Sequence, residues 1–272
     1  MTTTTFVDWG AARAAVAEAG PRLTAMLRTA DRADARALDD WDVTQVAAHI
    51  SHAADTIWAM TKGGGNLLEE IGGLAILTRV MVEAEGRRAL DELAARIDAT
   101  VAGFLADMET AGGDRPTRGC VQGTELHLST LTCHMLNELT VHGRDVAVAL
   151  GRPWPIDRAH AALIVQGFVF PALNTLGRSV VVDQKAGNVR ARFEVRLRGD
   201  GRAWLRFADG DFSVEGSPQG PVDCHLSVDP AAFMLVAWGR TSQWRAIAKG
   251  QLLAWGRKPW LGVQLRSWLR NP

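Results

Sequence analysis

The stretch HLSTLTCHMLNELTVHGRDVAVAL, residues 127–150, decides how this sequence is interpreted. Its apolar residues, among them Leu128, Met135 and Leu139, recur at intervals of three and four, which is typical of a helix with one buried side. A second row on the same predicted helix is polar and lies about 100° around the axis from the apolar row. That ionisable row contains His127, His134, Glu138, His142 and Asp145.

An ionisable row beside a buried seam needs a compensating partner, because burying unpaired ionisable groups costs on the order of several kcal/mol each. A divalent metal can compensate one carboxylate and two imidazoles together. Glu138 and His142 are one turn apart, with about 5–6 Å between their Cβ atoms, which suits a shared ion. The third ligand must come from another helix, where His49 is the better candidate and His52 the alternative. Three protein ligands leave a fourth position open, as in catalytic zinc sites.

The first part of the chain predicts a helical bundle. Helical periodicity extends over residues 9–29, interrupted at Gly20-Pro21, and over a second helix that begins at the N-cap Asp42, with Gln45 completing a capping box. Further helices are expected at 67–82, 85–108 and 124–150. Long helices joined by loops are typical of a four-helix bundle. We assign residues 1–152 to this domain.

Residues 153–272 predict a second, α+β domain with a mostly antiparallel sheet. Arginines and a glutamate alternate with apolar residues between Arg190 and Leu197, as expected of a half-buried strand. Glycine- and aspartate-rich triplets at 199–201 and 209–211 mark hairpin turns. The remaining elements are expected as helices at 157–173, 230–238, 241–248 and up to 269, and strands at 179–182, 203–207, 224–228 and 251–255.

Charge and composition exclude several classes of partner. The chain has 272 residues, a formal net charge of zero and a pI near 7.1, whereas nucleic acids and acidic membranes select a basic face. The longest apolar stretch, 161–173, is shorter than the roughly 20 residues of a membrane-spanning helix, and no secretory signal opens the chain. We expect a cytoplasmic protein with small-molecule partners and neither nucleic acid nor membrane as a partner. The sequence does not indicate an oligomeric state.

Two segments together resemble the mycothiol-dependent maleylpyruvate isomerase family, within the wider DinB-like helical bundles. They are WDVTQVAAHI at 41–50 and NELTVHGRD at 137–145. In that family a tryptophan-led helix supplies a histidine, and an E-x-x-x-H-x-x-D helix supplies a glutamate and a second histidine, to a divalent metal that is usually zinc. The resemblance implies that His49, Glu138 and His142 are metal ligands and that Asp145 orients the site. The second domain is more loosely similar to sterol-carrier-like domains.

The resemblance implies an enzyme whose open metal position binds mycothiol, an actinobacterial thiol, and stabilises its thiolate as the nucleophile. The reaction would be isomerisation or S-transfer on a small electrophilic substrate. Candidates for contacts with the cofactor or substrate are Arg144 and His134, with Arg79 and Arg118 as further candidates. The alternative is a non-catalytic small-molecule or lipid-binding protein with a structural or vestigial metal site. Spacing leaves zinc, iron, nickel and manganese open, and it leaves the substrate open.

Overall fold

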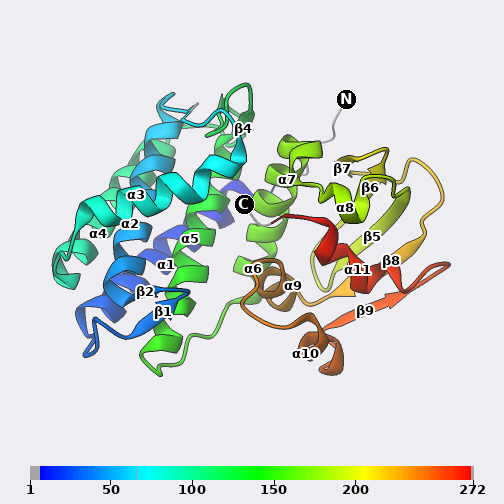
Figure 1. The fold of residues 1–272 in the computed structure, drawn as a ribbon. Helices are drawn as coiled ribbons and strands as arrows, with labels where there is room; N and C mark the ends of the chain where they lie inside the picture. The colour runs from blue at the N-terminus through cyan, green and yellow to red at the C-terminus, as the bar shows by residue number, and fades with distance from the viewer. Residues whose placement is uncertain (1–6, 66, 271–272) are drawn as a thin grey trace. The chain divides into compact units, whose positions relative to one another are not determined.

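The computed structural model describes residues 7–65 and 67–270, and the chain divides into two compact units, one ending at Ile156 and the other beginning at Asp157 (Figure 1). The first unit is a bundle in which α1 and α2 each pack against both α4 and α5, while the shorter α3 packs on α2. This confirms the predicted helical N-terminal domain. The helices are α1 (Trp9–Arg28), α2 (Val43–Thr61), α3 (Leu74–Glu85), α4 (Leu90–Met108) and α5 (Leu128–Ala149), with a 3-10 turn η1 (Ile71–Gly73) before α3.

Helix ends in the first unit follow from local chemistry, and one prediction about them is wrong. At the start of α2 the Asp42 side chain accepts a hydrogen bond from Gln45 N at 2.9 Å, and the Gln45 side chain accepts one from Asp42 N at 3.0 Å, which completes the predicted capping box. Gly20-Pro21 does not interrupt α1, which is continuous. A Cβ atom at Gly20 would lie 3.1 Å from Val101 Cγ1, so this glycine lets α1 and α4 approach closely.

Two short hairpins, not predicted from the sequence, lead into α2 and α5. The first pairs β1 (Arg36–Leu38) with β2 (Trp41–Asp42), and the second pairs β3 (Pro116–Arg118) with β4 (Glu125–His127). The last residue of each hairpin is the N-cap of the following helix. The helix predicted from residue 124 therefore begins only at Leu128, because 125–127 pair with 116–118 instead. Each hairpin fixes the start of one of the helices that carry the candidate site.

Packing around α5 leaves no room for a side chain at Gly143. A Cβ atom there would lie 2.4 Å from Trp154 Cζ2. The indole is held in place because its Nε1 donates a hydrogen bond to Thr140 O at 3.1 Å and because the Arg22 guanidinium lies 3.8 Å from the ring centroid.

We expect Gly143→Ala to lower the free energy of unfolding by about 1–3 kcal/mol through overpacking, as measured by urea denaturation. The matched control is Gly72→Ala in η1, where the added Cβ atom would meet nothing closer than 3.8 Å. Equal stability of the two variants would contradict the packing of Trp154 on α5.

The second unit contains a five-stranded sheet in the order β7-β6-β5-β8-β9. Only β5 and β8 run parallel, so the predicted mostly antiparallel sheet is confirmed. One face carries the predicted polar side chains, and the other packs an aromatic core around Phe193, Phe207, Phe212 and Trp268. The strands are β5 (Ala191–Leu197), β6 (Arg202–Ala208), β7 (Asp211–Glu215), β8 (Cys224–Val228) and β9 (Leu252–Trp255).

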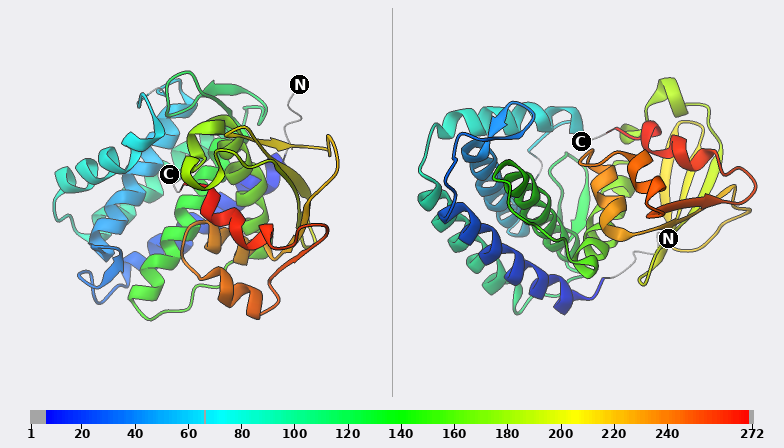
Figure 2. Two further views of the ribbon diagram at one scale, coloured as in Figure 1. Left: turned by 45° about the vertical axis from the view of Figure 1, so that its right-hand side comes forward. Right: turned by 90° about the horizontal axis from the view of Figure 1, so that it is seen from below.

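In the second unit, helices lie before the first strand, between the last two strands and after the last strand. Figure 2 shows the unit from two further sides. The unit begins with the consecutive segments α6 (Arg158–Ile164), η2 (Val165–Val169), α7 (Phe170–Leu176) and η3 (Gly177–Val180). The strand predicted at 179–182 is wrong, because η3 occupies its first half and the Ser179 hydroxyl donates to Leu176 O at 2.7 Å. The remaining helices are α8 (Asp183–Ala186), α9 (Pro230–Ala237), α10 (Gln243–Ala248) and α11 (Leu261–Trp268).

One helical run among the described residues, Arg158–Val180, is long and apolar enough to cross a membrane by length and composition. This run has 23 residues, so it is longer than the apolar stretch of 161–173 that was predicted from the sequence. The chain stays helical through Pro171, which stands at the start of α7, where a missing N–H is tolerated. A core helix of a folded domain has the same composition, and Ala161, Ala162 and Ile164 are buried.

Candidate metal centre

The structure brings His49 of α2 together with Glu138 and His142 of α5, and their ligand atoms all lie within 4.8 Å of one another. His49 Nε2 is 3.1 Å from His142 Nε2 and 3.2 Å from Glu138 Oε2, and His142 Nε2 is 3.5 Å from Glu138 Oε2. Ligand atoms around a tetrahedral Zn²⁺, at metal distances of about 2.0–2.2 Å, are separated by about 3.4 Å. The donor set and its spacing therefore fit a divalent cation.

Side chains around the three candidate ligands fix how they point. Asp145, itself buried, lies with Oδ2 3.1 Å from His142 Nδ1, which turns Nε2 of that ring toward Glu138. Glu138 Oε1 accepts a hydrogen bond from Asn137 Nδ2 at 3.1 Å and lies 3.3 Å from His134 Nε2. Only Oε2 of the carboxylate therefore faces the two ligand histidines. A carboxylate partner on a ligand histidine is the usual arrangement at protein metal sites.

Burial and hydrogen bonding shift the pKa values of the cluster in opposite directions. Burial raises the pKa of Glu138, but hydrogen bonds from His134, His142 and His49 outweigh it and hold the pKa well below its usual range. Burial lowers the pKa of His142, but Asp145 and then Glu138 outweigh it and raise the pKa to about 9. For His49 burial dominates, and its pKa is lowered. Without a metal, Glu138 is thus ionised and paired with a protonated His142.

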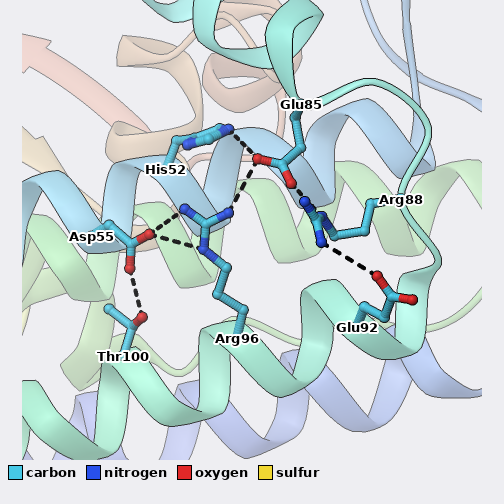
Figure 3. A network of polar contacts seen from close by, with 7 residues as sticks. All are labelled: His52, Asp55, Glu85, Arg88, Glu92, Arg96 and Thr100. Carbon is cyan, nitrogen blue, oxygen red and sulfur yellow. Dashed lines mark hydrogen bonds and ion pairs between the residues drawn. The ribbon is translucent and has the colours of Figure 1, made fainter.

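The alternative ligand His52 does not join this cluster. It belongs to a separate polar network between α2, α3 and α4, in which its Nε2 lies 2.9 Å from Glu85 Oε2 (Figure 3). Arg96 lies in the same network and bridges Glu85, at 3.1 Å, to Asp55, at 2.5 Å. Asp55 also accepts a hydrogen bond from Thr100, and Glu85 pairs with Arg88. His52 therefore anchors the end of α3.

We expect His52→Asn and His49→Asn to separate these two roles. The first should cost about 1 kcal/mol of unfolding free energy through the lost contact with Glu85 and leave metal stoichiometry unchanged. The second removes a candidate ligand and should abolish stoichiometric metal binding. Elemental analysis together with urea denaturation of both variants measures the difference. Loss of metal from His52→Asn alone would show that His52, and not His49, is the ligand.

Of the other candidate contacts, His134 lies beside the cluster, 3.3 Å from Glu138 Oε1. Arg144 comes two residues after His142, which places it about 200° around the helix and away from the cluster. Arg79 pairs with Asp40 at 3.0 Å on an exposed surface, and Arg118 is the last residue of β3. Asn137 was not singled out from the sequence, although its amide stands directly before Glu138 in the chain; the structure shows that both residues are buried.

Comparison with known proteins finds one family model that matches the first unit and another that matches part of the second. Residues 13–147 match the family described as mycothiol maleylpyruvate isomerase N-terminal domain, and residues 173–256 match the SCP-2 sterol transfer family. A search of the curated proteins found no match.

Two solved structures are similar to nearly the whole chain. One is a crystal structure of the mycothiol-dependent maleylpyruvate isomerase, at 17% identity and a TM-score of 0.54. The other is a crystal structure of a histidine-to-alanine mutant of that enzyme, at 15% identity and a TM-score of 0.55. In both cases the match covers 93% of this chain and 95% of that chain. At these identities the likeness shows the fold.

Proposed function

Because residues 13–147 belong to the mycothiol maleylpyruvate isomerase N-terminal domain family and residues 173–256 to the SCP-2 sterol transfer family, we propose that this protein is a metal-dependent enzyme that uses mycothiol. Its reaction would be isomerisation or S-transfer on a small electrophile, with zinc as the metal. The observation that carries the proposal is the convergence of His49, Glu138 and His142 from two helices. An enzyme of this kind needs no nucleic acid or membrane partner, and we place it in the cytoplasm.

At this centre some residues of the chain would bind the metal and others would orient those ligands. His49, Glu138 and His142 would hold the metal, which when bound supplies a Lewis acid that lowers the pKa of a thiol at its open position. With metal bound, Asp145 would hold His142 in the tautomer that leaves Nε2 free to bind. Asn137 and His134 hold Oε1 of Glu138, so Oε2 is the oxygen that would face the metal.

The experiment is elemental analysis of protein purified without a polyhistidine tag, followed by assays with and without mycothiol. We expect one divalent metal per chain and turnover of maleylpyruvate, or of a generic electrophile, only when both metal and thiol are present. Protein with stoichiometric metal and no thiol-dependent turnover of either substrate would contradict the enzymatic proposal.

The SCP-2 match favours a second candidate function, the binding of a lipid or other apolar small molecule by the second unit. In that case the metal centre would be structural or vestigial. Binding of a fluorescent fatty acid that is unaffected by Glu138→Gln, combined with an absence of turnover, would favour this candidate over the enzyme.

A further inference from the structure

On the polar face of the sheet in the second unit, three of the four arginines of β5 and β6 pair with a carboxylate. Strands β5 and β6, labelled in Figure 1, carry the arginines Arg192, Arg196, Arg202 and Arg206 on this face, where they alternate with buried residues. Arg196 and Arg202 both bind the buried Glu194, at 2.8 and 3.1 Å. Arg192 binds Glu215 of β7 at 2.9 Å. These three arginines therefore each have a carboxylate.

The guanidinium of Arg206 has no ion pair or hydrogen bond with any residue that the structure describes, although the residue is half-buried. Its direct neighbours across the sheet are Arg192 on β5 and Ser213 on β7. Like charges directly opposite each other in a sheet are destabilising. The carboxylate of Glu215 is already taken by Arg192. The position of Arg206 therefore leaves one positive charge uncompensated beside another arginine.

This unpaired arginine lines a cleft of about 280 Å³ on the same face. The cleft is also lined by Arg190, Arg192 and Arg257, and Asp223 is the single acidic residue among the described residues that line it. Asp223 is buried and already engaged, because it accepts hydrogen bonds from Arg192 N at 3.1 Å and Arg257 at 2.5 Å and lies 3.2 Å from Lys258 Nζ. Arg190 pairs with Asp209 at 2.7 Å. Guanidinium groups are thus in excess over carboxylates in this cleft.

We propose that this cleft binds the oxyanion group, carboxylate or phosphate, of a small ligand, with Arg206 as its main contact. Guanidinium groups bind such groups through two parallel hydrogen bonds. The volume suits a small anion, because sites for drug-sized ligands occupy about 300–1,000 Å³. A bound anion would supply the negative charge that Arg206 lacks as a partner, and it would reduce the repulsion between Arg206 and Arg192. The site is independent of the metal centre and of the function proposed for it.

The test is isothermal titration of the full-length protein with inorganic phosphate and, separately, with succinate, at constant ionic strength set with sodium chloride. We expect at least one of the two anions to bind, and the stronger one identifies the group as phosphate or carboxylate. Arg206→Gln should weaken binding by at least about tenfold, because the two-pronged donor is lost. Arg245→Gln, the same change at an exposed position on α10, should leave the affinity within about twofold.

Folding of the variant is checked in the same buffers without either anion. Arg206→Gln should then unfold at a temperature equal to or above that of the unsubstituted protein, since a like-charge pair has been removed. A second variant, Arg206→Lys, keeps the charge but loses the planar fork, and it should bind more weakly than the unsubstituted protein. Absence of binding by both anions, or equal affinity in Arg206→Gln, would overturn the proposal, the latter because the ions would then act only by general screening.

Discussion

Glu138→Gln is expected to abolish stoichiometric metal binding and to lower metal affinity by more than about 100-fold. Glu138 is the only anionic group of the three candidate ligands, and Gln has the same shape without the charge. Changes in groups that merely support a ligand already cost about 10–100-fold, so loss of the charged ligand itself should cost more. Mycothiol-dependent turnover should fall in proportion to the metal that is lost. Competition with a chromophoric chelator measures the affinity.

The matched control is Glu109→Gln, which makes the same chemical change at the exposed C-cap of α4. It should keep one metal per chain. Circular dichroism and urea denaturation of both variants without metal test whether the bundle is intact. If folded Glu138→Gln retained full metal affinity, the assignment of these three residues as a metal centre would fail, and the enzymatic proposal with it.

The spacing of Glu138 and His142 could be found from the sequence because both residues are on one helix, where a separation of four residues fixes the distance. The partner from the other helix was harder to choose. His49 and His52 are three residues apart, so they occupy neighbouring positions on α2, and periodicity alone does not separate them. The two histidines differ because His52 contacts Glu85 at the end of α3, whereas His49 does not. That contact joins segments distant in the sequence, and no local pattern encodes it.

The fold shows the same division between local and long-range information. The strand β5 has seven residues and alternates clearly, whereas β1, β2, β3 and β4 have two or three residues each, too short for any period to be recognised. The β-branched run at 179–182 favours a strand by composition, but β propensity depends on a place in a sheet. Residues 179 and 180 instead end a helical run.

Metal should cancel the fall in stability with rising pH that His142 contributes in the metal-free protein. In the metal-free protein the pKa of His142 is raised to about 9, above its usual value of 6.5. A raised folded-state pKa contributes stability that is fully present below pH 6.5 and is lost as the pH rises through 9. Metal binding needs the neutral imidazole and must displace that proton, so affinity should rise by about tenfold per pH unit between about 6.5 and 9.

Thermal unfolding of metal-free and metal-saturated protein over this range therefore gives two curves that diverge as the pH rises. His49 adds no further slope, because burial lowers its pKa and leaves it neutral there. Asp145→Asn provides the internal control: an amide does not stabilise the imidazolium at Nδ1, so the pKa of His142 should fall and the two curves should stop diverging at a lower pH. Parallel curves for the unsubstituted protein would mean that no proton is exchanged for the metal, and that His142 is not a ligand.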